Sequence, residues 1–474
     1  MSLGSLSSLR QSSPSVFDKR LQNSLWKDSP NSSVPLYKEM KNKLKTLPQD
    51  IQELLRCVSL RAAEHTVPAY LVGGCVRDLL LGVQNLDLDI VVEGDGIAFA
   101  EALAQSLNAK LICHRRFGTA TLYAGQRHKI DIATARKEVY PSPGHLPEVS
   151  SGVLKEDLFR RDFAVNAMAI DLTQECFGVL IDYFGGRDDL RAGVVRTLHD
   201  ASFLDDSTRI LRAIRFEQRY DFRIEPHTMK NLKEAVKLKM LNRMEPQRVR
   251  DELMLLLREQ HAVKAVRRLG QLVGFDFLHP RLHVTARTFA LMRAVRRQLD
   301  WFRKAHPQRR YLDTWLMNFM ALIDGLDTVS TAALCKKLML RRGEDMRIVS
   351  FKRIKKSSLE SISRPDVKPS RIFVFFEPLS YEVILMLKAK HSNTFLQEYI
   401  RDFFDIYTDI RLHSSGHDLR SLGLSPGPVY KKIFTRVLHA KLNGKIKTHE
   451  EELALIRRLT QSLKREGVTP GLIG

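Results

Sequence analysis

The sequence predicts an α+β domain, with a small mixed sheet and flanking helices, followed by an all-α region. Short β-type runs separated by glycine turns lie between residues 51 and 195, and from about residue 200 the apolar spacing becomes helical. The distribution of charged residues changes at the same place. Residues 1–200 hold 24 Lys+Arg and 24 Asp+Glu, whereas residues 201–474 hold 52 and 30, so the net charge of +22 lies in the second part. This asymmetry indicates chemistry in the first part and binding of a polyanion, most simply a nucleic acid, by the second.

The composition excludes several classes of protein. A length of 474 residues predicts two to four domains, and 44% hydrophobic with 27% charged residues is ordinary for a soluble globular chain. No uncharged apolar run approaches the roughly 18 residues that a membrane helix needs, so we expect no membrane partner. The five cysteines form no CxxC pair. This pattern favours reduced thiols in the cytoplasm and argues against a structural zinc site.

Residues 1–50 form an N-terminal extension that we expect to be disordered with some helix. The segment contains eleven serines and little apolar periodicity. Organellar targeting is the minor alternative, but Asp18 and Asp28 do not fit the acid-poor composition of a transit peptide.

The elements that follow are predicted from changes in apolar spacing. The expected strands are 67–72, 86–92, 109–113, 119–124 and 128–133. The expected helices are 51–63, 76–81, 97–107, 207–218, 226–238, 247–259 and 450–465. Residues 137–155 are rich in Pro, Gly and Ser and predict a loop.

The first motif that can carry chemistry is a glycine turn followed by two carboxylates. Gly73 and Gly74 stand between an expected strand and helix, with Arg77 at the start of that helix. Asp87 and Asp89 lie two apart on the next strand, so their side chains share one face. Two neighbouring carboxylates suit Mg²⁺, and this arrangement fits metal-assisted phosphoryl or nucleotidyl transfer. A lone Asp-x-Asp is more often an exposed strand edge, but the glycine turn upstream weighs against that reading.

Further polar residues follow along the chain. Asp131, on another expected strand, is a candidate third carboxylate or a plain solvent-facing residue. Arg160 and Arg161 suit a triphosphate, because the guanidinium group matches phosphate oxygens and stays charged. Asp162 and Asn166 are spaced i and i+4, so on a helix they would share a face and could hold a ribose hydroxyl. An ordinary helix-surface pair is equally compatible with that spacing.

The third motif is DDSTRILRAIRF, which begins at Asp205. Asp206 is placed to cap a helix. Arg209, Arg212 and Arg215 recur every three residues, which is typical of a solvated helix face. An Asp and an Arg at the two ends of one turn could also offer an acceptor and donors to the edge of a nucleobase.

Together these motifs resemble one family. LVGGCVRDLLLG, DLDIVVEGD, RRDFAVNAMAID, DYFGGRDDL and DDSTRILRAIRFEQRYDFRIEP are similar, in order and spacing, to the class II nucleotidyltransferases of the DNA polymerase β superfamily. That family includes CCA-adding, CC-adding and A-adding tRNA nucleotidyltransferases and bacterial poly(A) polymerases. The resemblance spans roughly residues 67–260.

The resemblance implies a role for each matching residue. Asp87 and Asp89 would hold two Mg²⁺ ions, and Gly73, Gly74 and Arg77 would contact the triphosphate of ATP or CTP. Arg161, Asp162 and Asn166 would bind the nucleotide. Asp206 and Arg209 would read the nucleobase edge, supported by Arg212 and Arg215. Asp205 stands where the family commonly has Glu.

The resemblance also implies the division of the chain. Residues 51–195 would be the catalytic head, 196–262 the neck that recognises the nucleobase, and 263–474 the helical, basic body and tail. The loop 137–155 would match the family's flexible element. A late stretch, HDLRSLGLSPGPVYKKIF, resembles the tail of bacterial members and would direct the positive charge to phosphates of tRNA. No protein partner is inferred.

The expected activity is therefore transfer of CMP, AMP or both to the 3′-hydroxyl of tRNA with release of pyrophosphate. A bacterial-type poly(A) polymerase is the alternative, since it shares the head motifs. A catalytically inactive RNA-binding protein is a further alternative, which the complete set of carboxylates and glycines does not favour.

Overall fold

The computed structural model describes residues 36–83, 87–125, 128–141 and 147–465. The chain divides into two compact units, residues 1–277 and 278–474. Most of the expected N-terminal extension, residues 1–35, lies outside the described residues. Among the described residues, no helix is both long and apolar enough to cross a membrane.

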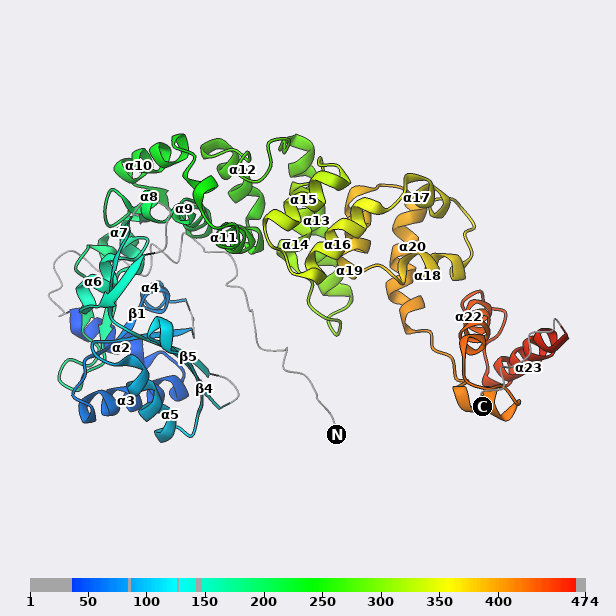
Figure 1. Cartoon of the computed structure of the whole chain (residues 1–474), viewed down its shortest axis with the longest axis horizontal. Helices are drawn as coiled ribbons and strands as arrows, with labels where there is room; N and C mark the ends of the chain where they lie inside the picture. Colours follow the sequence, from blue (N-terminus) through cyan, green and yellow to red (C-terminus); the bar gives the residue numbers. More distant parts are fainter. Residues whose placement is uncertain (1–35, 84–86, 126–127, 142–146, 466–474) are drawn as a thin grey trace. The chain divides into compact units, whose positions relative to one another are not determined.

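The first unit is built around a seven-stranded mixed sheet (Figure 1). Its strand order is β3-β4-β5-β2-β1-β8-β9, and β2 with β5 is its parallel pair. The strands are β1 (Ala69–Val72), β2 (Leu88–Val92), β3 (Lys110–His114), β4 (Thr119–Ala124), β5 (His128–Thr134), β8 (Ala169–Asp171) and β9 (Leu180–Ile181). The expected mixed sheet is therefore confirmed.

Helices cover the sheet and continue the first unit beyond it (Figure 1). They are α2 (Leu36–Lys45), α3 (Gln49–Glu64), α4 (Gly74–Leu80), α5 (Gly96–Ser106), α6 (Leu154–Phe159), α7 (Gly186–Ala192), α8 (Ser202–Asp205), α9 (Thr208–Tyr220), α10 (Pro226–Lys237), α11 (Pro246–Arg258) and α12 (Ala262–Leu272). Short 3₁₀ turns are η1 (Arg115–Phe117), η2 (Ala164–Asn166) and η3 (Met240–Arg243). A buried apolar cluster joins β1, β2 and β8 to α6, and this packing fixes α6 against one face of the sheet.

One expectation for this unit was wrong in part. The segment 137–155 was expected to be a loop, but it contributes most of a two-stranded hairpin, β6 (Arg136–Val139) with β7 (Glu148–Ser151), and the start of α6. All four residues of β7 are exposed, so this strand buries no apolar face and is held by its pairing with β6. Residues 142–146, inside the same expected loop, lie outside the described residues. A second short pair, β10 (Val194–Val195) with β11 (Arg223–Ile224), is parallel.

The second unit is helical throughout its described residues (Figure 1). Its elements are α13 (Ala286–Ala305), α14 (Thr314–Leu322), α15 (Thr328–Lys337), α16 (Arg342–Arg353), α17 (Lys356–Ile362), α18 (Pro369–Phe376), α19 (Tyr381–Lys390), α20 (Thr394–Asp405), η4 (Tyr407–Asp409), α21 (Gly416–Ser421), α22 (Pro428–Leu442) and α23 (His449–Arg465). Helices α14 and α19 are buried along most of their length and form its core. The expected all-α region is therefore confirmed, while the boundaries drawn at residues 195 and 262 stay predictions.

Candidate functional site

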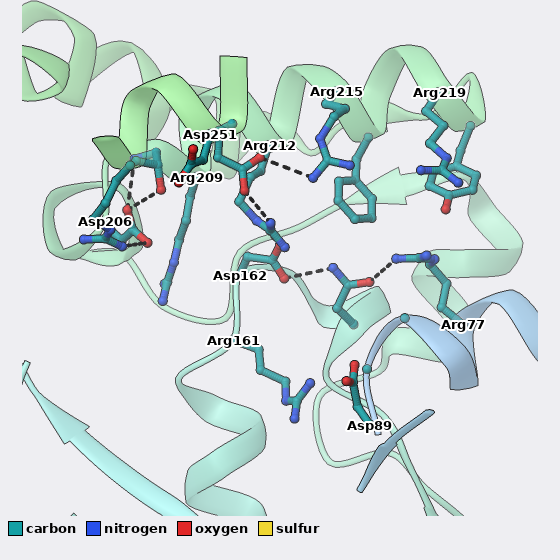
Figure 2. Close-up of a pocket in the computed structure, with 18 residues that line it drawn as sticks. Arg77, Asp89, Arg161, Asp162, Asp206, Arg209, Arg212, Arg215, Arg219 and Asp251 are labelled. Carbon is teal, nitrogen blue, oxygen red and sulfur yellow. Dashed lines mark hydrogen bonds and ion pairs between the residues drawn. The ribbon is translucent and has the colours of Figure 1, made fainter. Parts of the chain in front are cut away.

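A polar pocket of about 580 Å³ lies in the first unit, between the sheet and helices α9 and α11. Seven arginines and five carboxylates contribute to its lining. Figure 2 shows Arg212, Arg215 and Arg219 projecting from one helix, with Arg161 and Asp89 on the opposite side. The excess of positive charge suits an anionic ligand such as a triphosphate.

The glycine turn lies at one wall of this pocket. Gly73 has a φ of +75°, in the region that favours glycine. A Cβ atom at Gly73 would lie 2.8 Å from Nη1 of Arg161 and 3.7 Å from Oδ2 of Asp89. A side chain is thus excluded where the turn, a guanidinium and a carboxylate meet. Arg161 is itself oriented by Asp157, which accepts from its Nη2 at 2.9 Å.

Asp89 carries a negative charge that its surroundings compensate poorly. Burial raises its pKa to about 6, and the nearby guanidinium of Arg161 opposes that rise. Asp131 and Asp87 add to it by repulsion. Asp131 is the register partner of Asp89 in the parallel pair β2–β5, so both side chains lie on one face. Asp131 accepts hydrogen bonds from Thr121 at 2.7 Å and Lys129 at 2.5 Å.

These carboxylates fit Mg²⁺ as a group of hard oxygen ligands. Mg²⁺ commonly takes one or two carboxylates and completes its coordination with water and substrate phosphate. Among the described residues, no group of three or more His, Cys, Asp or Glu is arranged to hold a metal ion.

Arg77 also lines the pocket, but each of the three nitrogen atoms of its guanidinium already contacts another side chain of the protein. Its Nε and Nη2 lie 2.8 and 2.7 Å from Oδ1 of Asp78, and its Nη1 donates to Asn166 at 2.6 Å. The same group lies over the rings of Phe216 and Tyr220, at 5.1 and 5.0 Å. Arg77 therefore joins α4 to α9 beneath the pocket.

Asp162 is the centre of a buried polar network. It accepts from Nδ2 of Asn166 at 2.9 Å and from Nε and Nη2 of Arg212 at 2.8 and 2.6 Å. Burial would raise the pKa of Asp162, but Arg212 and the hydrogen bonds lower it to about 2. The Asp162–Asn166 contact anticipated from i, i+4 spacing forms, although through the 3₁₀ turn η2 and not an α-helix.

Asp206 and Arg209 line the pocket at the beginning of helix α9 (Figure 2). Asp206 accepts from the backbone N–H of Thr208 at 3.0 Å, so it caps the start of α9. Arg209 donates to Oγ of Ser202 at 2.7 Å and to the carbonyl of Arg160 at 2.6 Å. Each group keeps hydrogen-bonding capacity, because a guanidinium has five N–H donors and a carboxylate about four acceptor positions.

Helix α11 supplies pocket residues that sequence reasoning missed. Arg248 donates to Oδ2 of Asp206 at 2.6 Å. Glu252 accepts from Arg212 at 2.8 Å and from Arg215 at 3.3 Å. Their i, i+4 spacing in RVRDEL was a usable signal, since it places a cation and an anion on one helix face. Asp251, Thr208, Phe216, Arg219 and Tyr220 also line the pocket without having been singled out.

The pocket brings together most of the residues singled out from the sequence. Its lining includes Gly73, Gly74, Arg77, Asp89, Arg161, Asp162, Asn166, Asp206, Arg209, Arg212 and Arg215. Asp87 and Asp131 lie outside that lining; Asp87 is exposed immediately before β2. Asp205 is outside it as well, with Oδ2 3.8 Å from Nδ1 of His199.

Two family profiles match the first unit and its junction with the second. Residues 69–196 match the poly A polymerase head domain, and residues 221–285 match a probable RNA- and SrmB-binding site of polymerase A.

Relatives with longer matches are tRNA nucleotidyltransferases. The A-adding tRNA nucleotidyltransferase of Geobacter sulfurreducens is 38% identical over 88% of this chain, which spans about half (48%) of that relative. The A-adding tRNA nucleotidyltransferase of Halalkalibacterium halodurans is 32% identical over 87% of this chain and 93% of the relative.

Solved structures that are similar to this chain include CCA-adding enzymes. The Thermotoga maritima CCA-adding enzyme complexed with tRNA has a TM-score of 0.66 and 34% identity, over 90% of this chain and 98% of that one. A CCA-adding enzyme complexed with ATP has a TM-score of 0.67 and 33% identity, over 92% and 98% of the two chains.

Proposed function

This chain belongs to the tRNA nucleotidyltransferase family, and we propose that it transfers AMP from ATP to the 3′-hydroxyl of a tRNA that ends in CC, with release of pyrophosphate. The observation that carries the proposal is the pocket that holds Asp89, Arg161 and the Asp206/Arg209 pair within one unit. AMP addition is the step shared by the A-adding and CCA-adding relatives that match most of this chain. Addition of CMP before AMP is the further possibility that the experiment below decides.

The pocket offers contacts both to the phosphates and to the base of a nucleoside triphosphate. The N–H groups of Arg161, beside the glycine turn, suit the phosphates. An adenine edge presents an amino donor beside a ring-nitrogen acceptor, and a carboxylate with a guanidinium complements it. Asp206 and Arg209 supply those two groups, with Asp206 oriented by Arg248.

The carboxylates Asp87 and Asp89, with Asp131 beside them, would hold the Mg²⁺ ions, and bound Mg²⁺ supplies stabilisation for the negative charge that develops on the phosphate and the attacking oxygen. Asp162, Asn166 and Arg212 keep the nucleotide-facing surface rigid, because their network ties η2 to α9. A cytoplasmic location accords with this role in tRNA processing and stays a prediction.

The basic second unit is proposed to bind the body of the tRNA. Residues 278–474 hold 36 Lys+Arg and 19 Asp+Glu, a net charge of +17, and arginine and lysine contacts to phosphates give affinity without reading sequence. This accounts for recognition of many tRNAs by one enzyme.

Nucleotide incorporation tests the proposal. Three transcripts of one tRNA, ending at the discriminator base, after one C and after CC, are incubated with ATP, CTP or both and Mg²⁺. We expect one AMP on the CC-ended transcript with ATP alone. Stepwise CMP addition to the shorter transcripts would extend the activity to full CCA addition, and its absence would limit it to A addition. No incorporation, or a long ATP-dependent ladder on unrelated RNA, would overturn the proposal.

A further inference from the structure

Four aromatic rings form a continuous row on the surface of the first unit. The ring centres of Tyr183 and Phe184 are 6.2 Å apart, those of Phe184 and Phe159 are 5.8 Å apart, and those of Phe159 and His199 are 5.2 Å apart. The row draws on three separate segments of the chain, namely the end of α6, the turn before α7 and the segment before α8. Tertiary packing therefore assembles it.

The rings of Tyr183 and Phe159 are partly exposed to solvent, while the ring of Phe184, which lies between them in the row, packs against the protein interior. Phe159 is 45% exposed and Tyr183 is 50% exposed, whereas Phe184 packs against the buried cluster of the sheet. Phe184 thus supplies the apolar contact with the core, and that role does not require Phe159 or Tyr183. A single exposed apolar side chain is ordinary on a protein surface, whereas adjoining exposed apolar side chains are typical of binding sites.

The ammonium group of Lys155 lies beside the aromatic row. The ammonium of Lys155 lies 5.7 Å from the ring centre of Tyr183. Aromatic faces with neighbouring positive charge are the composition that binds unpaired nucleotides, because bases stack on the rings and phosphates attract the cation.

One end of the row, Phe159 and His199, is adjacent in sequence or in space to residues that contact the pocket lining. Phe159 directly precedes Arg160 and Arg161, and the carbonyl of Arg160 accepts a hydrogen bond from Arg209. At the same end of the row, Nδ1 of His199 lies 3.8 Å from Oδ2 of Asp205, the sequence neighbour of Asp206 in the pocket lining. A strand of RNA whose last nucleotide reaches the pocket would therefore have its preceding nucleotides close to these rings.

We propose that the aromatic row, Tyr183, Phe184, Phe159 and His199, binds the unpaired nucleotides at the 3′ end of the RNA substrate by stacking. The proposal rests on the proposed function, which supplies a substrate with a single-stranded 3′ end. Stacking is tolerant of base identity, since every base has an aromatic face. The row therefore accepts the discriminator position of any tRNA and positions the terminal hydroxyl without reading sequence.

The test uses the full chain and a tRNA transcript ending in CC, with 2-aminopurine at the discriminator position. A second transcript ends at the last base pair of the acceptor stem. The variant Phe159→Leu/Tyr183→Leu keeps apolar side chains but removes both aromatic faces. Phe117→Leu is the matched control, because Phe117 is 61% exposed, lies near Arg116 and is remote in sequence from the row.

We expect the double variant to bind the CC-ended transcript roughly tenfold more weakly, in line with stacking energies of about one base, and to lose the quenching of 2-aminopurine. Binding of the truncated transcript should change less than about twofold, and Phe117→Leu should match the wild type. The KM for tRNA should rise while the KM for ATP stays the same. A second double variant, Phe159→Trp/Tyr183→Leu, returns one aromatic face to the row and should restore most of the quenching.

Other outcomes overturn the proposal. Equal weakening for both transcripts would indicate a general loss of RNA binding, and a raised KM for ATP alone would assign the rings to the nucleotide. A change only in self-association would make the row a protein contact. If the wild type shows 2-aminopurine quenching but adds no nucleotide, the proposed function fails while the stacking surface stands.

Discussion

The guanidinium of Arg77 lies 5.0 Å from the ring centre of Tyr220, and this contact joins helix α4 to helix α9. Phe216 covers the same guanidinium at 5.1 Å, and Asp78 and Asn166 occupy its nitrogen atoms. The side chain of Arg77 is 8% exposed. Arg77 therefore acts as a brace: its contacts with Phe216 and Tyr220 fix helix α4, and the glycine turn at its start, against helix α9.

Replacing Arg77 with Lys should weaken this brace although the charge is kept. A lysine ammonium cannot form the planar fork to Asp78 or stack between two rings in the same way. We expect the free energy of unfolding of the first unit to fall by about 2–4 kcal/mol, because a buried carboxylate loses part of its pairing. Urea titrations followed by far-UV circular dichroism measure this change.

Tryptophan fluorescence provides the internal control for that variant. Of the three tryptophans, Trp301 and Trp315 belong to the second unit and Trp26 lies outside the described residues, so the measurement uses a Trp26→Phe background. Their unfolding transition should stay where it is in the wild type. An unchanged transition of the first unit would show that Arg77 is not a brace.

Asp89→Asn should separate activity from stability. We expect AMP transfer to fall by about 10³-fold or more, because a ligand for the cation that stabilises phosphate charge is lost. The thermal midpoint without added metal should stay the same or rise, since the substitution removes a charge that burial, Asp131 and Asp87 disfavour. Affinity for tRNA should stay within about twofold. Single-turnover incorporation, scanning calorimetry and filter binding check the three outcomes, and retained transfer would remove Asp89 from the metal site.

Arg248→Gln should alter nucleotide recognition more than folding. Arg248 holds Oδ2 of Asp206 at 2.6 Å and is 31% exposed, so the ion pair itself contributes at most about 1 kcal/mol. Without it the Asp206 carboxylate is fixed only by the start of α9. We expect the KM for ATP to rise several-fold and incorporation to become less selective between ATP and CTP. Arg191→Gln, on α7, is a control that should leave both quantities unchanged.

The local elements of the first unit were predictable because each has a local cause. Gly73 occupies a turn whose positive φ favours glycine, and the alternation of side-chain direction along β2 places Asp89 on one face of the sheet. The hairpin β6–β7 was missed because each strand carries a single apolar residue, a valine, and β7 is fully exposed, so no apolar face marks the pair. Backbone pairing between residues 9 to 15 positions apart creates it.

The pairings within the site could not be read from spacing. The arginines of α9 were visible as a stripe, but the stripe alone does not show that Arg212 meets Asp162, fifty positions earlier. Likewise, Arg248 reaches Asp206 across forty-two positions because α11 packs against α9. Such contacts form where two helices or turns pack together. The spacing of residues along the sequence does not show which elements will pack against each other.

The second unit should show an acid-dependent loss of stability that centres on Glu382. This side chain is fully buried, and both of its oxygens accept from Arg310, at 2.7 and 2.8 Å. Burial alone would raise the pKa of Glu382, but the hydrogen bonds and charge of Arg310 lower it to about 2. A carboxyl group whose pKa is lower in the folded state stabilises that state above its unfolded value of about 4.5. The stabilisation, on the order of 2–3 kcal/mol, is lost as the pH falls from about 4.5 toward 2.

Glu382→Gln tests this dependence. At pH 7 we expect the second unit of the variant to unfold at lower urea, because the amide leaves Arg310 without its carboxylate partner. Between pH 5 and 3 the wild type should lose stability faster than the variant, so that the two curves converge. In a Trp26→Phe background, urea titrations followed by the fluorescence of Trp301 and Trp315 report on this unit. Parallel curves across that range would mean that Glu382 is protonated at its ordinary pKa, and that its contacts with Arg310 persist without charge.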